Sequence, residues 1–248
     1  MSASSRVSPT PTPPRRFSGA AAAGARIRLP MRVWDLPTRL FHWLVVLLIA
    51  LSYVSINLAD DSVTWMRIHL LSGYAMLTLL LFRLVWGFAG SDTARFRQFV
   101  RSPIAGLRHL RDFRTRTPDD QVGHNEAGGW MVLGLLASLG VQVVSGLFSN
   151  SDGGPEGPLA HLVSQSTSDL LSTVHAISFK VLLGFMAVHV VAIILYAVVK
   201  GHRLIWPMIT GKKRLPAATR APRMASLTLA ALVLVCATAA VLVLVRFA

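Results

Sequence analysis

The sequence is poor in cysteine and in charged residues, acidic residues above all. Its single cysteine, Cys236, excludes a disulfide framework, a thiolate-held iron–sulfur cluster and a cofactor attached through C-x-x-C-H. Only 15% of the 248 residues are charged, and 11 Asp and Glu stand against 25 Lys and Arg. A soluble domain of this size would show amphipathic stripes around one core, whereas 53% of this chain is hydrophobic and gathered in long runs.

Each of these apolar runs is long enough to cross a hydrocarbon core about 30 Å thick as a helix. They cover residues 40–58, 68–89, 129–148, 174–199 and 225–245. The segments between them are polar or rich in Pro and Gly. The pattern predicts an all-α integral membrane protein with five transmembrane helices, and a lipid bilayer as its surroundings.

Lys and Arg are concentrated in alternate connections between the runs, and residues 60–67 hold only one of them. They lie before the first run, between the second and third, and after the fourth, whereas residues 149–172 contain none. This positive-inside pattern predicts a cytoplasmic N-terminus and a periplasmic C-terminus in a bacterial inner membrane. Topology and anionic lipid explain the net charge of +14, so we expect no nucleic-acid partner.

The first thirty residues are rich in Ser, Pro, Thr and Arg, with a short Ala/Gly run. "RRFSGAAAAGARIR" faintly resembles a twin-arginine signal, but its apolar stretch is short and Arg26 and Arg28 follow at once. We therefore interpret residues 1–30 as a disordered cytoplasmic tail.

Four histidines lie within or at the edge of the apolar runs: His42, His69, His175 and His189. An ionisable residue in the membrane is costly and often functional, although an interhelical hydrogen bond could explain any single one. His175 and His189 are 14 residues apart, so they share one helix face about 21 Å apart along its axis. In the predicted topology His69 lies at the outer depth of His175, and His42 at the inner depth of His189, which predicts two facing pairs.

Two bis-histidine sites suit haem b better than other metal groups. Zinc would need three or four clustered ligands, and copper or non-haem iron would usually add a thiolate, thioether or carboxylate. Three further residues could serve the same sites. Arg83, 14 residues after His69, could neutralise propionates of the inner haem or simply flank the span. Lys180 could pair with a propionate or extend to the interface, and Gly73 could admit the porphyrin plane.

Several motifs resemble the bacterial cytochrome b561 family, and within it the cytochrome b subunits associated with nickel–iron hydrogenases. They are "RVWDLPTRLFHW" (32–43), "HLLSGY" (69–74), "FRLVWGFAG" (82–90), "GHNEAGGWM" (123–131) and the two histidines of the fourth run. The resemblance covers about residues 31–212 and implies a four-helix transmembrane bundle with two b haems. The axial ligands it implies are His42, His69, His175 and His189. Residues 213–248 would then form a linker and an additional helix.

The resemblance also implies a di-haem cytochrome that transfers electrons between the quinone pool and a periplasmic redox partner, such as a c-type cytochrome or a hydrogenase. Two alternatives are a superoxide:quinone oxidoreductase and a haem-bearing membrane anchor of a larger redox complex, so enzymatic activity stays open. The predicted outer loops are acidic: Asp60, Asp61, Asp152, Glu156 and Asp169 stand against Arg67. Negative charge would repel superoxide and fits a basic partner.

A quinone site is suggested by "GHNEAGGW", which places His124 and Glu126 just before the third run on the inner side. Quinone chemistry moves protons with electrons, and a histidine beside a carboxylate suits that task. Helix capping is the alternative, with Asn125 as the cap and Glu126 in the first turn.

The charge pattern makes a direct prediction about topology. Reporter domains fused after Asp112 and after Lys212 should be cytoplasmic, and one fused after Gly154 should be periplasmic, because basic connections stay inside. Alkaline phosphatase and fluorescent-protein fusions measure this. A periplasmic signal after Asp112 would reverse the orientation and exchange the inner and outer histidine pairs.

Overall fold

A computed structural model of the chain describes residues 27–59, 62–100, 104, 118–150 and 155–247. Most of these residues are helical. Five helices are long and apolar enough to cross a membrane, which agrees with the predicted count. They are α2 (Leu36–Asn57), α3 (Val63–Ala89), α6 (Glu126–Leu147), α7 (Gln165–Leu195) and α9 (Leu227–Phe247).

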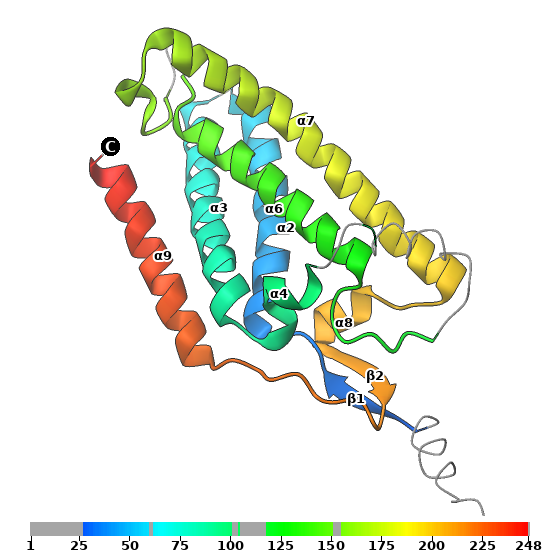
Figure 1. Ribbon diagram of the computed structural model, residues 1–248. Helices are drawn as coiled ribbons and strands as arrows, with labels where there is room; N and C mark the ends of the chain where they lie inside the picture. The colour runs from blue at the N-terminus through cyan, green and yellow to red at the C-terminus, as the bar shows by residue number, and fades with distance from the viewer. Residues whose placement is uncertain (1–26, 60–61, 101–103, 105–117, 151–154, 248) are drawn as a thin grey trace, which may run out of the picture.

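The helices are arranged as two hairpins with α9 added on the outside (Figure 1). Helix α2 packs along α3, α6 packs along α7, and α3 contacts α6, which joins the hairpins. Their shared core includes Ile49, Met76, Leu139, Val143 and Leu182. Large apolar side chains cover the outer faces of the same helices, as expected of surfaces that lipid would cover.

Four of the long helices begin at a polar side chain that caps their free N–H groups. Asp35, Ser62, Asn125 and Ser164 cap α2, α3, α6 and α7 in turn. Asp35 is 4% exposed and accepts two hydrogen bonds, from the Thr38 N–H at 2.7 Å and from Trp86 Nε1 at 3.1 Å. The Asp35 carboxylate therefore fixes the start of α2 against α3.

One end of the bundle, which we call the sheet end, carries a short antiparallel strand pair. Strand β1 (Arg28–Arg32) precedes α2, and β2 (Lys212–Pro216) follows the short helix α8 (Ile205–Thr210). The elements η2 (Asp92–Ala94) and α4 (Phe96–Phe99) lie at the same end (Figure 1). The predicted segment boundaries at residues 31 and 212 fall inside the two strands, and residues 1–26 of the predicted tail lie outside the described residues.

The opposite end, which we call the loop end, holds the α2–α3 and α6–α7 connections. Helix η3 (Ala160–Leu162) belongs to it, and α7 begins there. At the sheet end, α7 continues through the π-helical turn η4 (Tyr196–Lys200) into α8. Its C-terminal part diverges from α2 toward the sheet end (Figure 1).

Helix α9 runs from the sheet end to the loop end against α3 (Figure 1). Ala230 and Ala237 are buried in a cluster with Phe82 and Trp86, and small residues allow such close approach between helices. The segment before α9 is fixed by two hydrogen bonds: the Asp92 N–H donates to the Arg223 carbonyl oxygen, and the Arg223 N–H donates to the Asp92 carboxylate. None of the four intramembrane histidines lies on α9, which acts here as a packing helix.

Candidate functional site

At the loop end, α3 and α7 bring two of the predicted histidines face to face. The ring centroids of His69 and His175 are 6.2 Å apart, with their planes at 87°. His69 Nδ1 lies 3.0 Å from the Ser52 carbonyl oxygen, and His175 Nδ1 lies 2.8 Å from the Gln142 carbonyl oxygen. An Nδ1–H that donates to a carbonyl fixes the tautomer and leaves Nε2 with a lone pair.

The sequence did not identify Ser52 and Gln142 as partners of these histidines. Gln142 also places its amide nitrogen 3.1 Å from His175 Nε2, and its amide oxygen accepts from the Ser178 hydroxyl. A metal ion bound at His175 Nε2 would have to displace the Gln142 amide nitrogen that lies next to it. An isolated glutamine in an apolar run was the available signal, because such residues in membranes pair with polar neighbours.

Two glycines lie beside this pair. A Cβ on Gly146 would stand 2.8 Å from His175 Cε1 and 2.9 Å from His175 Nδ1, so only glycine lets the ring rest against α6 in this position. A Cβ on Gly73 would meet no heavy atom within 4 Å, so the backbone of α3 has open space beside it. Lys180, the third predicted residue on this side, is exposed on α7.

Toward the sheet end, His42 on α2 and His189 on α7 form the second predicted pair. Both are half-buried. Within the described residues, the His42 and His189 rings are not in contact, whereas the His69 and His175 rings are. The second pair is therefore more widely spaced than the first. His42 Nδ1 is buried without a hydrogen-bond partner in the described part of the chain.

Two further buried groups surround the second pair. Arg83 is 3% exposed, its guanidinium lies 4.9 Å above the Phe96 ring, and its Nη1 has no partner within the described residues. His124 packs between the Trp34 and Phe99 rings, with centroids at 4.6 and 5.0 Å. Burial, and then the nearby charge of Arg83, lowers the pKa of His124 to about 3, so its imidazole is neutral at pH 7.

His124 also lines a cavity of about 420 Å³ at the sheet end, together with Asp92 and Gln121. Next to it, the Asn125 side chain accepts from the Gly128 N–H at 2.6 Å, and Glu126 is the first residue of α6. The structure therefore contains the helix cap that the sequence offered as an alternative. The two readings are compatible, because His124 precedes the cap and faces the cavity.

The described residues contain no cluster of three or more His, Cys, Asp or Glu side chains that could hold a metal ion. The bundle instead contains two pairs of histidines, and the two members of each pair come from different helices. Paired imidazoles in apolar surroundings suit a metal whose remaining ligands come from an organic ring system.

Comparison with known proteins identifies one matching family. A family model described as prokaryotic cytochrome b561 matches residues 33–211. No curated protein and no solved structure matches the chain. The matched segment includes all four histidines and ends before α9.

Proposed function

The chain belongs to the prokaryotic cytochrome b561 family, and from that membership we propose a di-haem b cytochrome that transfers electrons between a quinone and a periplasmic redox protein. Family membership itself makes the chain a membrane haem b electron-transfer protein. When bound, haem b supplies a one-electron redox centre whose potential depends on its axial ligands and on nearby hydrogen bonds. The contribution of this chain is to hold, orient and shield that centre.

The His69–His175 pair is the observation that carries the proposal. Histidine nitrogens bind metal ions at about 2.0–2.1 Å, so imidazoles on opposite sides of one iron have ring centres roughly 6 Å apart. The observed separation is 6.2 Å. Both Nδ1 atoms face backbone carbonyls, which leaves each Nε2 lone pair available to serve as an axial ligand.

The second haem site of the proposal consists of His42 and His189. Its main support is Arg83, because a buried guanidinium with an unpaired Nη1 calls for an anion. A haem propionate is such an anion, and Arg binds carboxylates well. At the first site, Lys180 could reach a propionate near the interface, and the open space beside Gly73 would admit a flat ring.

The depths of the two pairs support transfer across the membrane. His175 and His189 are separated by 14 residues of one helix, about 21 Å, and a hydrocarbon core is about 30 Å thick. A redox site near each surface can serve one reactant on each side. We propose that the sheet end faces the cytoplasm of a bacterial inner membrane and the loop end faces the periplasm.

The proposed quinone site lies at the sheet end, around His124 and Glu126. Neutral His124 can donate a hydrogen bond to a quinone oxygen or accept one from a quinol hydroxyl, and the cavity beside it supplies access for protons from the aqueous side. The charges of His42 and His189 act on His124, so this site adjoins the second histidine pair. Glu126 would serve as a nearby carboxylate in proton exchange.

The loop end suggests the nature of the redox partner. Among its described residues, Glu156 and Asp169 are acidic, while Asp60, Asp61 and Asp152 lie outside the described residues. Acidic side chains favour a basic partner, such as a c-type cytochrome, and disfavour attraction of superoxide. A hydrogenase partner, or a role as the haem-bearing anchor of a larger complex, would use the same surface.

The haem proposal predicts two non-covalent b haems per chain. His175→Ala should remove one haem and His189→Ala the other, because each substitution removes one axial ligand from a different pair. Pyridine haemochrome assays against protein concentration, with redox titration of each variant, measure this. A single haem in the unmodified protein would refute the two-pair arrangement.

A second prediction concerns Gly146. Gly146→Ala should displace the His175 ring, since the new Cβ would lie 2.8 Å from it, and overpacking of this kind costs about 1–3 kcal/mol. We expect loss or an altered potential of the haem at the loop end only. Gly140→Ala on the same helix is the matched control, because its nearest contact would be 3.9 Å. Equal effects of both substitutions would contradict the packing argument.

A third prediction tests the quinone site. His124→Ala should slow quinol-dependent haem reduction by about tenfold or more, because a positioned hydrogen-bonding group is lost. Stopped-flow spectroscopy measures this rate, and reduction by dithionite should stay unchanged as the control. Unchanged quinol kinetics would remove His124 from the site, whereas loss of a haem would mean that an axial ligand is wrongly assigned.

A further inference from the structure

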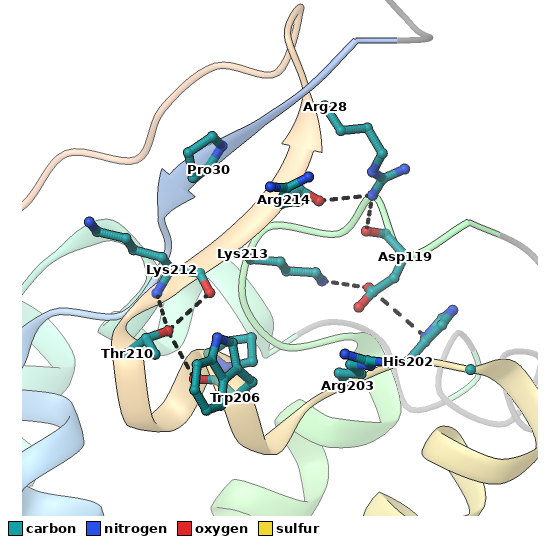
Figure 2. Close-up of a pocket in the computed structure, with 12 residues that line it drawn as sticks. Arg28, Pro30, Asp119, His202, Arg203, Trp206, Thr210, Lys212, Lys213 and Arg214 are labelled. Atoms are coloured by element: carbon teal, nitrogen blue, oxygen red, sulfur yellow. Dashed lines mark hydrogen bonds and ion pairs between the residues drawn. The ribbon is translucent and has the colours of Figure 1, made fainter.

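A second cavity at the sheet end has no role in the electron-transfer proposal. It has a volume of about 680 Å³, within the usual range for small-molecule sites, and lies between the strand pair and α8 (Figure 2). Basic side chains dominate its lining: Arg28, Arg203, Lys212, Lys213 and Arg214. Asp119 is the acidic residue among its lining residues.

Some of these cations are already neutralised. Lys213 Nζ lies 2.5 Å from Asp119 Oδ1 and donates to the Gln121 carbonyl at 2.7 Å. Arg28 pairs with Asp120 at 2.7 Å. Asp119, the one acidic residue in the lining, is therefore already paired with Lys213.

The side chains of Arg203, Lys212 and Arg214 are different. All three are exposed, and no hydrogen bond or ion pair of their side chains is recorded in the described part of the chain. In Figure 2, Arg203 and Arg214 lie on either side of the Lys213–Asp119 pair, whereas Lys212 lies beside Thr210 and extends away from that pair. Three uncompensated cations around one cavity favour an anionic ligand.

The position of the cavity relative to the membrane narrows the choice of anion. Helix α8 is held against the start of α2, because Trp43 Nε1 donates to the Met208 carbonyl and Arg39 donates to the Ile209 carbonyl. Since the α2 span begins at Leu36 and the α7 span ends at Lys200, α8 lies at the edge of the membrane.

Helix α8 also exposes apolar side chains beside the cavity. Ile205, Trp206 and Ile209 are 54%, 63% and 50% exposed, and Trp206 lines the cavity itself. Tryptophan prefers the interface of a bilayer, where its ring lies at the level of the headgroups. A ligand with a phosphate and acyl chains would satisfy the cations and cover these side chains together, which a soluble anion could not do.

We propose that this cavity binds the phosphate group of an anionic phospholipid. Arg203 and Arg214 contact the phosphate, Lys212 adds positive charge to the lining, and the exposed side chains of α8 contact the acyl chains near the glycerol. Basic pockets at the cytoplasmic membrane surface commonly bind such headgroups. The bound lipid fixes α8 and the strand pair against the first turn of α2.

Lipid binding to the purified full-length protein tests this site. Native mass spectrometry in mild detergent, with added phosphatidylglycerol or phosphatidylcholine of the same acyl chains, compares the headgroups. We expect phosphatidylglycerol to bind several-fold more strongly, and inorganic phosphate at the same concentration not to displace it. Equal binding of the two lipids, or full displacement by inorganic phosphate, would overturn the proposal; this comparison needs no variant.

A pair of matched variants locates the site. Arg203→Gln/Arg214→Gln should weaken phosphatidylglycerol binding by about tenfold, because two cations near the phosphate are lost. Arg97→Gln/Arg220→Gln removes the same charge from exposed positions at the same end, in the lining of the separate His124 cavity, and should change binding less than twofold. Equal losses in both would show a general charge effect and overturn the proposal. Fluorescence size-exclusion chromatography checks that both variants fold.

Discussion

Two histidines hydrogen-bonded to helix carbonyls lie where the two hairpins meet. His69 on α3 is hydrogen-bonded to the Ser52 carbonyl on α2, and His175 on α7 to the Gln142 carbonyl on α6. A carbonyl oxygen has two lone pairs, so it can accept from a side chain while it keeps its helix bond. Each histidine thereby links the two helices of its own hairpin by a hydrogen bond. The ring centroids of the two imidazoles lie 6.2 Å apart where the hairpins join.

The sheet end follows a different principle. There the Asp35 carboxylate accepts from the first turn of α2 and from Trp86, and no hydrogen bond joins it to Arg83 within the described residues. Arg83, His42 and His124 each keep a buried polar atom without a partner in the described chain. Such atoms are costly in a low-dielectric interior. Unsatisfied donors next to the wider histidine pair support the binding of charged or polar molecules at this end.

Hydropathy and helical periodicity predicted the five spans and grouped the histidines by depth, because both depend on local sequence. Helix α7 nevertheless starts at Gln165, well before the predicted 174, since its first turns are polar and hydropathy detects only the lipid-facing part. The β1–β2 pairing was not predicted, because it joins segments far apart in sequence. The sequence does not reveal backbone acceptors such as the Ser52 carbonyl, because every residue has a carbonyl group. The packing role of Gly146 can be recognised only when the position of the His175 ring is known.

The strand pair links the helices of the second histidine pair. Strand β1 leads into α2, and β2 follows α8 after α7, so the pair ties together the two helices that carry His42 and His189. The Val33 and Trp34 N–H groups also donate to the Gly211 carbonyl, at 2.8 and 3.2 Å. Because α7 diverges from α2 toward this end, no direct helix packing sets the separation of His42 from His189. That separation depends instead on the strand pair and α8, the same elements that a bound phospholipid would hold in place.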